Sequence, residues 1–304
     1  MIVKAITADS LRVDFAGGNA DALDLAKQTF QRHGCCLVNG LLTSEDLEPI
    51  HDYLRQLIQL RMQHAGVTAK PDVDGQRRFD DGFLQLTQAD RHHAEVIFDA
   101  CRRLLPLHML SVDERLVNLA QQLINGNLIM ASGGGAIRID HPNETKYLFK
   151  WHQDYPYIMD SEDAVVFWIP MHDINHENGC LNLAPGSHNL GLLPLRIHDL
   201  RNSTNNKQGF MEIADPAVAD RFPQIEVPMK AGDILAFSTL ALHASGRNTS
   251  SRARWTAQIR FGNFADRKSI RRDWPGGLRD GSWFDEKHPE YVVNLKELLE
   301  PEQS

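Results

Sequence analysis

The sequence predicts a mainly β protein with helical additions, in which a helical first part packs on a β-barrel or sandwich. From about residue 126 onwards, short apolar runs alternate with turn residues at near-regular spacing, which is typical of a barrel or sandwich. Before that point, apolar residues recur at helical spacing. We see no linker or internal repeat, so we expect a single domain over 1–304, with a helical part at about 1–125, a β core at about 126–264 and an extension at 265–304.

Four helices are expected in the first part, at 19–34, 43–64, 89–105 and 112–125. The first ends at Gly34 and is followed by a short strand at 35–40. Thr43 with Asp46 resembles a capping box at the start of the second helix, and Ser111 with Glu114 forms such a box for the fourth. Residues 66–82 are polar and contain Gly and Pro, so we expect a loop there.

The β part should contain strands at 128–140, 146–152, 163–170, 179–184, 225–228, 233–239 and 254–264. A polar stretch at 202–208 interrupts them, and we expect it either to close over a bound substrate as a lid or to be an ordinary surface loop.

The composition is that of a globular protein, with 42% hydrophobic and 24% charged residues. The net charge of -8 and the lack of a long Lys/Arg-rich stretch argue against a nucleic-acid partner. No apolar run is long enough to span a membrane, and the first residues do not resemble a secretory signal. The four cysteines show neither metal spacing nor a disulfide framework, so we expect a cytoplasmic protein.

His152 and Asp154 form a pair that suits metal binding. If 146–152 is a strand that continues through them, residues two apart point to the same side, so the imidazole and the carboxylate share one volume. Two histidines and one carboxylate form the facial triad of non-haem Fe(II) sites, so a second histidine is needed. The expected strand at 233–239 leads to His243, which could supply it, although a buried or rim histidine without a ligand role would also fit.

The next strand places polar residues at alternate positions, at Arg252, Arg254, Thr256, Gln258 and Arg260. A half-exposed strand would show the same alternation. If the chain between His243 and Arg254 forms a hairpin, the two strands are about 4.8 Å apart and the guanidinium can reach a carboxylate bound beside His243.

These residues, together with four motifs, resemble the phytanoyl-CoA dioxygenase family of Fe(II)/2-oxoglutarate oxygenases. The motifs are His152-Gln153-Asp154, Asn178-Gly179-Cys180-Leu181 running to Pro185-Gly186-Ser187-His188, Ala231-Gly232-Asp233, and His243-Ala244-Ser245-Gly246 followed by Arg254. Their order and spacing over about 150–262 match the family. The resemblance implies a double-stranded β-helix, or jelly roll, flanked by the N-terminal helices.

Carried over residue by residue, the resemblance implies that His152, Asp154 and His243 bind iron and that Arg254, with Ser245, binds the distal carboxylate of 2-oxoglutarate. Gln153 and Trp168 lie where the family lines the cosubstrate pocket, although Trp168 could equally be a core aromatic residue.

The cofactors implied are Fe(II), 2-oxoglutarate as cosubstrate, and O2. The implied reaction is hydroxylation of an aliphatic C–H in a small molecule, with release of succinate and CO2. Halogenating relatives lack the carboxylate ligand, so Asp154 favours hydroxylation, while desaturation and cyclisation stay open.

The substrate itself is not encoded in a motif. Lys150, Arg138 and Arg260 could face the cavity, and Tyr157 could do so if Pro156 bends the chain. Several cations would suit an anionic substrate, whereas cations on the outer face of the barrel would be surface charge.

Other functions remain as alternatives. A jelly roll can bind a metal or ligand without turnover, but such a module does not need Arg254 in addition to three ligands. A cupin-like hydrolase or isomerase likewise has no use for that arginine. His172 and His176 have the spacing of zinc ligands on a helix, but the Asp, Asn and Gly residues around them predict a turn.

Overall fold

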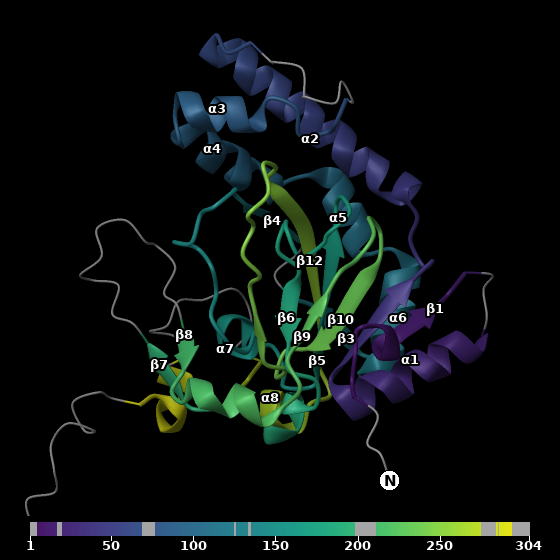
Figure 1. The fold of residues 1–304 in the computed structure, drawn as a ribbon. Helices are drawn as coiled ribbons and strands as arrows, with labels where there is room; N and C mark the ends of the chain where they lie inside the picture. The colour runs from purple at the N-terminus through teal and green to yellow at the C-terminus, as the bar shows by residue number, and fades with distance from the viewer. Residues whose placement is uncertain are drawn as a thin grey trace, which may run out of the picture.

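The computed structural model describes residues 5–16, 20–68, 77–124, 126–132, 135–197, 211–274, 284 and 286–293. Within these residues the central element is a seven-stranded sheet in the order β1-β2-β10-β5-β12-β3, with β4 also paired to β12 (Figure 1). Its strands are β1 (Arg12–Asp14), β2 (Cys35–Asn39), β3 (Ile129–Ala131), β4 (Ala136–Asp140), β5 (Ala164–Pro170), β10 (Ile234–Ser238) and β12 (Arg254–Asn263). The neighbours β10, β5 and β12 are antiparallel, whereas β1 runs parallel to β2.

A second, three-stranded sheet has the order β11-β6-β9, and a separate pair is formed by β7 and β8. These strands are β6 (Leu181–Leu183), β7 (Leu195–Ile197), β8 (Met211–Ile213), β9 (Ile225–Val227) and β11 (His243–Ala244). Leu181 and Val227 of the small sheet share one apolar cluster with Leu37, Trp168 and Leu235 of the large sheet. The two sheets therefore pack face to face, as expected for a jelly roll.

Helices cover the other face of the large sheet (Figure 1). They are α1 (Ala20–His33), α2 (Ser44–Ala65), α3 (Phe83–Ala89), α4 (His92–Cys101), α5 (Leu105–Ser111) and α6 (Glu114–Leu123), and the β part adds α7 (Tyr155–Ile158) and α8 (Arg267–Arg271). Short 3-10 helices occupy Asp9–Leu11, Ser187–Leu190, Pro216–Arg221 and Pro289–Tyr291. In the described part of the chain, no helix combines the length and apolarity needed to cross a membrane.

The helical part confirms the first, second and fourth predicted helices, although the fourth has a different N-cap, and it divides the third. Thr43 and Asp46 do form a capping box at the start of α2. The helix predicted at 89–105 is wrong in extent, because α4 ends at Cys101 and Pro106, in the first turn of α5, begins a new helix. Ser111 is the last residue of α5 and does not cap α6. The N-cap of α6 is Asp113, whose carboxylate accepts a hydrogen bond from the backbone N–H of Arg115.

Most predicted strands are present, but the strand predicted at 146–152 is wrong. That stretch contains only an isolated bridge between His152 and His243. Its backbone is used for turns, and immediately after it Asp154 and Pro156 open the short helix α7. The predicted lid at 202–208 lies outside the described residues.

Strand β12 has two chemically different faces. Trp255, Ala257, Ile259 and Phe261 pack into the cluster formed with the helices. The alternate residues, which include Arg254 and Arg260, therefore point into the space between the two sheets.

We expect the apolar face of β12 to be a main source of stability. Ile259 is buried, with 2% of its surface exposed, so Ile259→Ala should lower the free energy of unfolding by about 2–5 kcal/mol through lost packing and a residual cavity. Urea denaturation measures this change. Leu60→Ala is the matched control: Leu60 is 63% exposed, and its loss should change stability by less than about 0.5 kcal/mol. Equal losses in both variants would contradict the assignment of this face.

Candidate metal centre

His152, Asp154 and His243 are brought together by the backbone around α7 and β11. The amide of His152 donates to the carbonyl of His243 at 3.0 Å, and the amide of His243 donates back at 3.1 Å. The amides of Asp154 and Tyr155 both donate to the carbonyl of Thr239, at 2.9 and 3.0 Å. The sequence analysis predicted that His152 and Asp154 share one volume because they alternate along a strand, and that reason is wrong. Asp154 has a helical backbone, at φ -78° and ψ -26°, and its side chain turns toward His152 at the start of α7.

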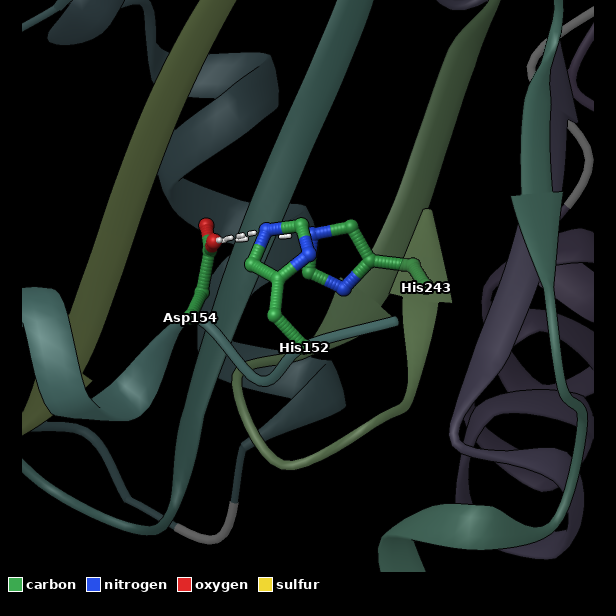
Figure 2. Close-up of side chains that lie close together, drawn as sticks. All are labelled: His152, Asp154 and His243. Carbon is green, nitrogen blue, oxygen red and sulfur yellow. Dashed lines mark ion pairs between the residues drawn. The ribbon is translucent and has the colours of Figure 1, made fainter. Parts of the chain in front are cut away.

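The three side chains converge on one point (Figure 2). Oδ1 of Asp154 is 3.6 Å from Nε2 of His152 and 3.4 Å from Nε2 of His243. Ligands that bind one transition-metal ion in neighbouring positions at about 2.1 Å are about 3 Å apart. Small adjustments would therefore let these atoms share an ion, and all three residues are buried.

Each histidine is held in the tautomer that a metal requires. Nδ1 of His152 lies 2.7 Å from the carbonyl oxygen of Lys150, and Nδ1 of His243 lies 3.0 Å from that of Ala241. Because a carbonyl oxygen can only accept, both Nδ1 atoms carry the proton. The Nε2 atoms of the neutral rings then present lone pairs to the shared point, as in metal sites whose histidines are fixed by a second hydrogen bond.

The electrostatics of the site agree with this ligand set. Burial, followed by the neighbouring His243, lowers the pKa of His152 to about 4, so its ring is neutral near pH 7. Burial would raise the pKa of Asp154, but the neighbouring Arg260 guanidinium holds that pKa well below its ordinary value. Two neutral imidazoles and one carboxylate fit a non-haem Fe(II) ion with positions left open.

Arg254 lies in the same interior, but it reaches there from the opposite sheet. The hairpin predicted between His243 and Arg254 is wrong, because β11 pairs with β6 whereas β12 pairs with β4 and β5. Arg254 is 1% exposed. Its Nε and Nη2 contact Oδ2 of Asp140 at 3.2 and 2.7 Å.

Asp140 pairs with both Arg254 and Arg138, and Arg138 in turn contacts Ser245. Arg138 Nη2 is 2.7 Å from Oδ1 of Asp140 and donates to Oγ of Ser245 at 3.4 Å. The amide of Phe149 also donates to Ser245 Oγ, at 3.2 Å. Burial would raise the pKa of Asp140, but Arg138 and Arg254 hold it far below its ordinary value, so the carboxylate is charged. Sequence reasoning missed Asp140, although it shares the strand parity of Arg138 in the predicted strand 128–140.

Gln153 and Trp168, which the resemblance places in the lining of the cosubstrate pocket, both make contacts within the fold. The Gln153 amide nitrogen donates to the carbonyls of Gly191 and Leu240 at 2.8 and 2.7 Å, and its oxygen accepts from the Leu193 amide at 2.9 Å. These hydrogen bonds hold the neighbouring loops in place. They use both N–H groups of the Gln153 side chain, so neither is left to donate to a cosubstrate. Trp168 is a buried core residue on β5, with its ring 6.0 Å from the Arg254 guanidinium carbon.

Among the proposed substrate residues, the structure brings three to the interior. Tyr157 reaches it through the Pro156 turn, with its ring 6.0 Å from that of His152. Arg138 lies over the ring of Phe149 at 4.9 Å, and Arg260 contacts Asp154. The expectation for Lys150 was wrong: its side chain is 76% exposed and pairs with Glu212 at 3.0 Å.

The histidine pair considered for zinc does not form a site. His172 contacts the backbone amide of Trp255, whereas His176 instead lies beside Cys180 and Glu226. The latter three residues could hold an ion, but His176 and Glu226 are exposed and hydrogen-bonded directly to each other.

Comparison with known proteins gives the same family as the motifs. The family model for phytanoyl-CoA dioxygenase matches residues 30–256. L-proline trans-4-hydroxylase of Streptomyces griseoviridis is 29% identical over 178 residues, which are 54% of this chain and 63% of that protein. Peroxisomal phytanoyl-CoA dioxygenase of Mus musculus is 24% identical over 244 residues, covering 78% of this chain and 67% of the mouse protein. The match to the hydroxylase thus spans less than two thirds of its length.

Solved structures show the same fold. EctD from S. alaskensis with bound Fe has a TM-score of 0.51 at 15% identity, over 92% of this chain and 82% of that chain. The epimerase SnoN, in complex with Fe3+, alpha ketoglutarate and nogalamycin RO, has a TM-score of 0.50 at 17% identity. The match covers 81% of this chain and 85% of the SnoN chain. The family match includes all three residues of the metal centre and Arg254. The chain therefore belongs to the phytanoyl-CoA dioxygenase family of iron- and 2-oxoglutarate-dependent oxygenases.

Proposed function

We propose that the protein is an Fe(II)- and 2-oxoglutarate-dependent dioxygenase that hydroxylates an aliphatic C–H of a small anionic molecule. The observation that carries the proposal is the convergence of two histidine Nε2 atoms and Oδ1 of Asp154 on one buried point. When bound there, iron with 2-oxoglutarate and O2 would supply the oxidant, with release of succinate and CO2.

The residues around the ligands would orient the reactants and limit water. The rings of Phe149 and Phe237 lie 4.9 and 4.6 Å from those of His152 and His243. This apolar surrounding keeps the imidazoles in place and strengthens electrostatic interactions at the ion. The presence of the Asp154 carboxylate supports hydroxylation over halogenation, as the family resemblance implies.

Arg254 and Ser245 would bind the distal carboxylate of 2-oxoglutarate. Arg254 is anchored by Asp140 and by the carbonyls of Gly179 and Gly246, so its guanidinium is fixed before any ligand arrives. Among the described residues, Nη2 of Arg254 contacts Oδ2 of Asp140 at 2.7 Å, so its second N–H could donate to the cosubstrate. Arg138, next to Ser245, adds a second cation, and its Nη1 donates to no described residue.

Replacing Arg254 should weaken cosubstrate binding selectively. Arg254→Met should lower 2-oxoglutarate affinity about ten- to a hundred-fold, because a charge-assisted hydrogen bond is lost. The fold should survive, because Asp140 keeps its pairing with Arg138. Anaerobic calorimetry with Mn(II) in place of Fe(II) measures the affinity.

Lys150→Met is the matched control, because it removes the same charge at an exposed position. It should leave 2-oxoglutarate affinity unchanged. An equal effect of both substitutions, or no effect of Arg254→Met, would count against the cosubstrate site.

Charge favours an anionic substrate. Three interior arginines, Arg138, Arg254 and Arg260, face the two carboxylates of Asp140 and Asp154, which leaves one positive charge. Fe(II) and the 2-oxoglutarate dianion cancel each other. The remaining charge suits one carboxylate on the substrate. The similarity to an L-proline hydroxylase supports small carboxylic acids as a first class to test.

Small carboxylates should therefore stimulate turnover where their neutral derivatives do not. We expect some members of a panel of amino acids and other small acids, including L-proline, to increase succinate formation, while the corresponding amides and methyl esters fail. Succinate and oxidised product are measured by mass spectrometry. Stimulation by neutral compounds alone would contradict an anionic substrate and leave the oxygenase assignment intact.

The alternative is a jelly roll that binds metal or ligand without turnover. The oxygenase proposal expects slow conversion of 2-oxoglutarate to succinate with Fe(II) and O2, even without substrate. His243→Ala should abolish this conversion because it removes a ligand, whereas His176→Ala, at an exposed histidine, should not. Metal binding without succinate formation in the unaltered protein would favour the binding module.

A further inference from the structure

We propose that Arg260 is a positioning residue that keeps Asp154 bound to the metal through Oδ1 alone, and so preserves a coordination position for the cosubstrate or O2. This inference rests on the proposed function, because it concerns the same ion. It gives Arg260 a different role from the substrate contact predicted from the sequence.

The two oxygens of Asp154 have separate partners. Oδ1 faces both histidines, at 3.6 and 3.4 Å from their Nε2 atoms. Oδ2 faces Arg260, accepting from Nε at 3.0 Å and lying 2.9 Å from Nη2. The carboxylate therefore directs one oxygen to the metal point and the other to the guanidinium.

Arg260 is well placed to hold this orientation. It lies in the middle of β12, opposite Val166 of β5, within the large sheet. Its Nη2 also donates to Oε1 of Gln258 at 2.7 Å, and its side chain is only 18% exposed. A guanidinium group that is already held by its strand and by a second hydrogen bond loses little conformational entropy when it binds a carboxylate.

The division of the carboxylate matters because carboxylates can bind a metal through one or both oxygens. If Oδ2 also bound the ion, it would occupy a position that a chelating 2-oxoacid and O2 need. To reach the ion, Oδ2 would have to leave two guanidinium nitrogens in a buried site, where charge-assisted hydrogen bonds are strong. Arg260 thus opposes the second metal bond.

The two simpler roles for Arg260 make different predictions. A structural ion pair would stabilise the fold, and its loss would weaken metal and cosubstrate binding together. An anchor for the substrate anion would leave both unchanged. If Arg260 controls how Asp154 binds the metal, its loss should affect the two affinities differently. Metal affinity should be kept, because a second carboxylate oxygen can bind the ion, and cosubstrate affinity should fall, because a coordination position is lost.

The test compares Arg260→Met and Arg260→Lys with Arg252→Met, each in the 304-residue chain. Arg252 is the matched control because it makes a similar arginine–aspartate pair, with Asp80 at 2.7 and 3.2 Å, away from the metal ligands. Three properties are measured: Mn(II) affinity, the number of exchangeable waters on bound Mn(II) from water-proton relaxation, and anaerobic 2-oxoglutarate affinity.

We expect Arg260→Met to bind Mn(II) at least as tightly as the unaltered protein, with one fewer exchangeable water and at least about ten-fold weaker 2-oxoglutarate binding. Arg260→Lys, which keeps the charge and one donor group, should recover part of both losses. Arg252→Met should alter thermal stability only. The proposal is overturned if Arg260→Met keeps the full water count, or if metal and cosubstrate affinity fall in parallel.

The water count needs only Mn(II), so it tests Arg260 even if the cosubstrate assignment is wrong. If the unaltered protein binds Mn(II) but shows no metal-dependent binding of 2-oxoglutarate, the proposed function fails. A lost water in Arg260→Met would still support the positioning role in that case.

Discussion

Two buried carboxylates at the centre of the molecule must be neutralised, and this requirement determines which side chains surround them. Asp140 is held by Arg138 and Arg254, and Asp154 is held by Arg260. An unpaired charge in this interior would be strongly unfavourable, so the arginines belong to the fold as much as to the site. Because three arginines pair with two carboxylates, one positive charge of this group is not balanced, which is the basis for proposing an anionic substrate.

Strand β12 links this interior to the helical layer. Its apolar side chains, such as Trp255 and Ile259, are buried against the helices. Its alternate side chains supply Arg254, which pairs with Asp140, and Arg260, which pairs with the candidate iron ligand Asp154. A shift of the strand by one residue would put arginines into the apolar core, so helix packing fixes the register of the functional groups.

Local sequence rules predicted well wherever neighbouring residues set the structure. The capping box of Thr43 and Asp46 and the alternation of β12 are of this kind. The rules failed where distant contacts decide. The stretch before His152 has strand-like composition, but it makes only an isolated bridge to the distant His243. The single helix predicted at 89–105 failed for a local reason, because Pro106 begins the separate helix α5. Asp140 was missed because nothing local distinguishes a carboxylate that two distant arginines will surround.

The family, the jelly roll and the three candidate iron ligands could be predicted from the sequence, because motif order and residue chemistry carry that information. The way in which the ligands meet depends on long-range packing, because Asp154 turns inward at the start of a helix and Arg254 comes from the opposite sheet. The same packing also decides that Lys150 lies at the surface while Arg260 binds the free oxygen of Asp154. Strand parity tells only which side of its own strand a residue occupies, whereas the partner that a buried charge finds depends on how separate strands are packed together.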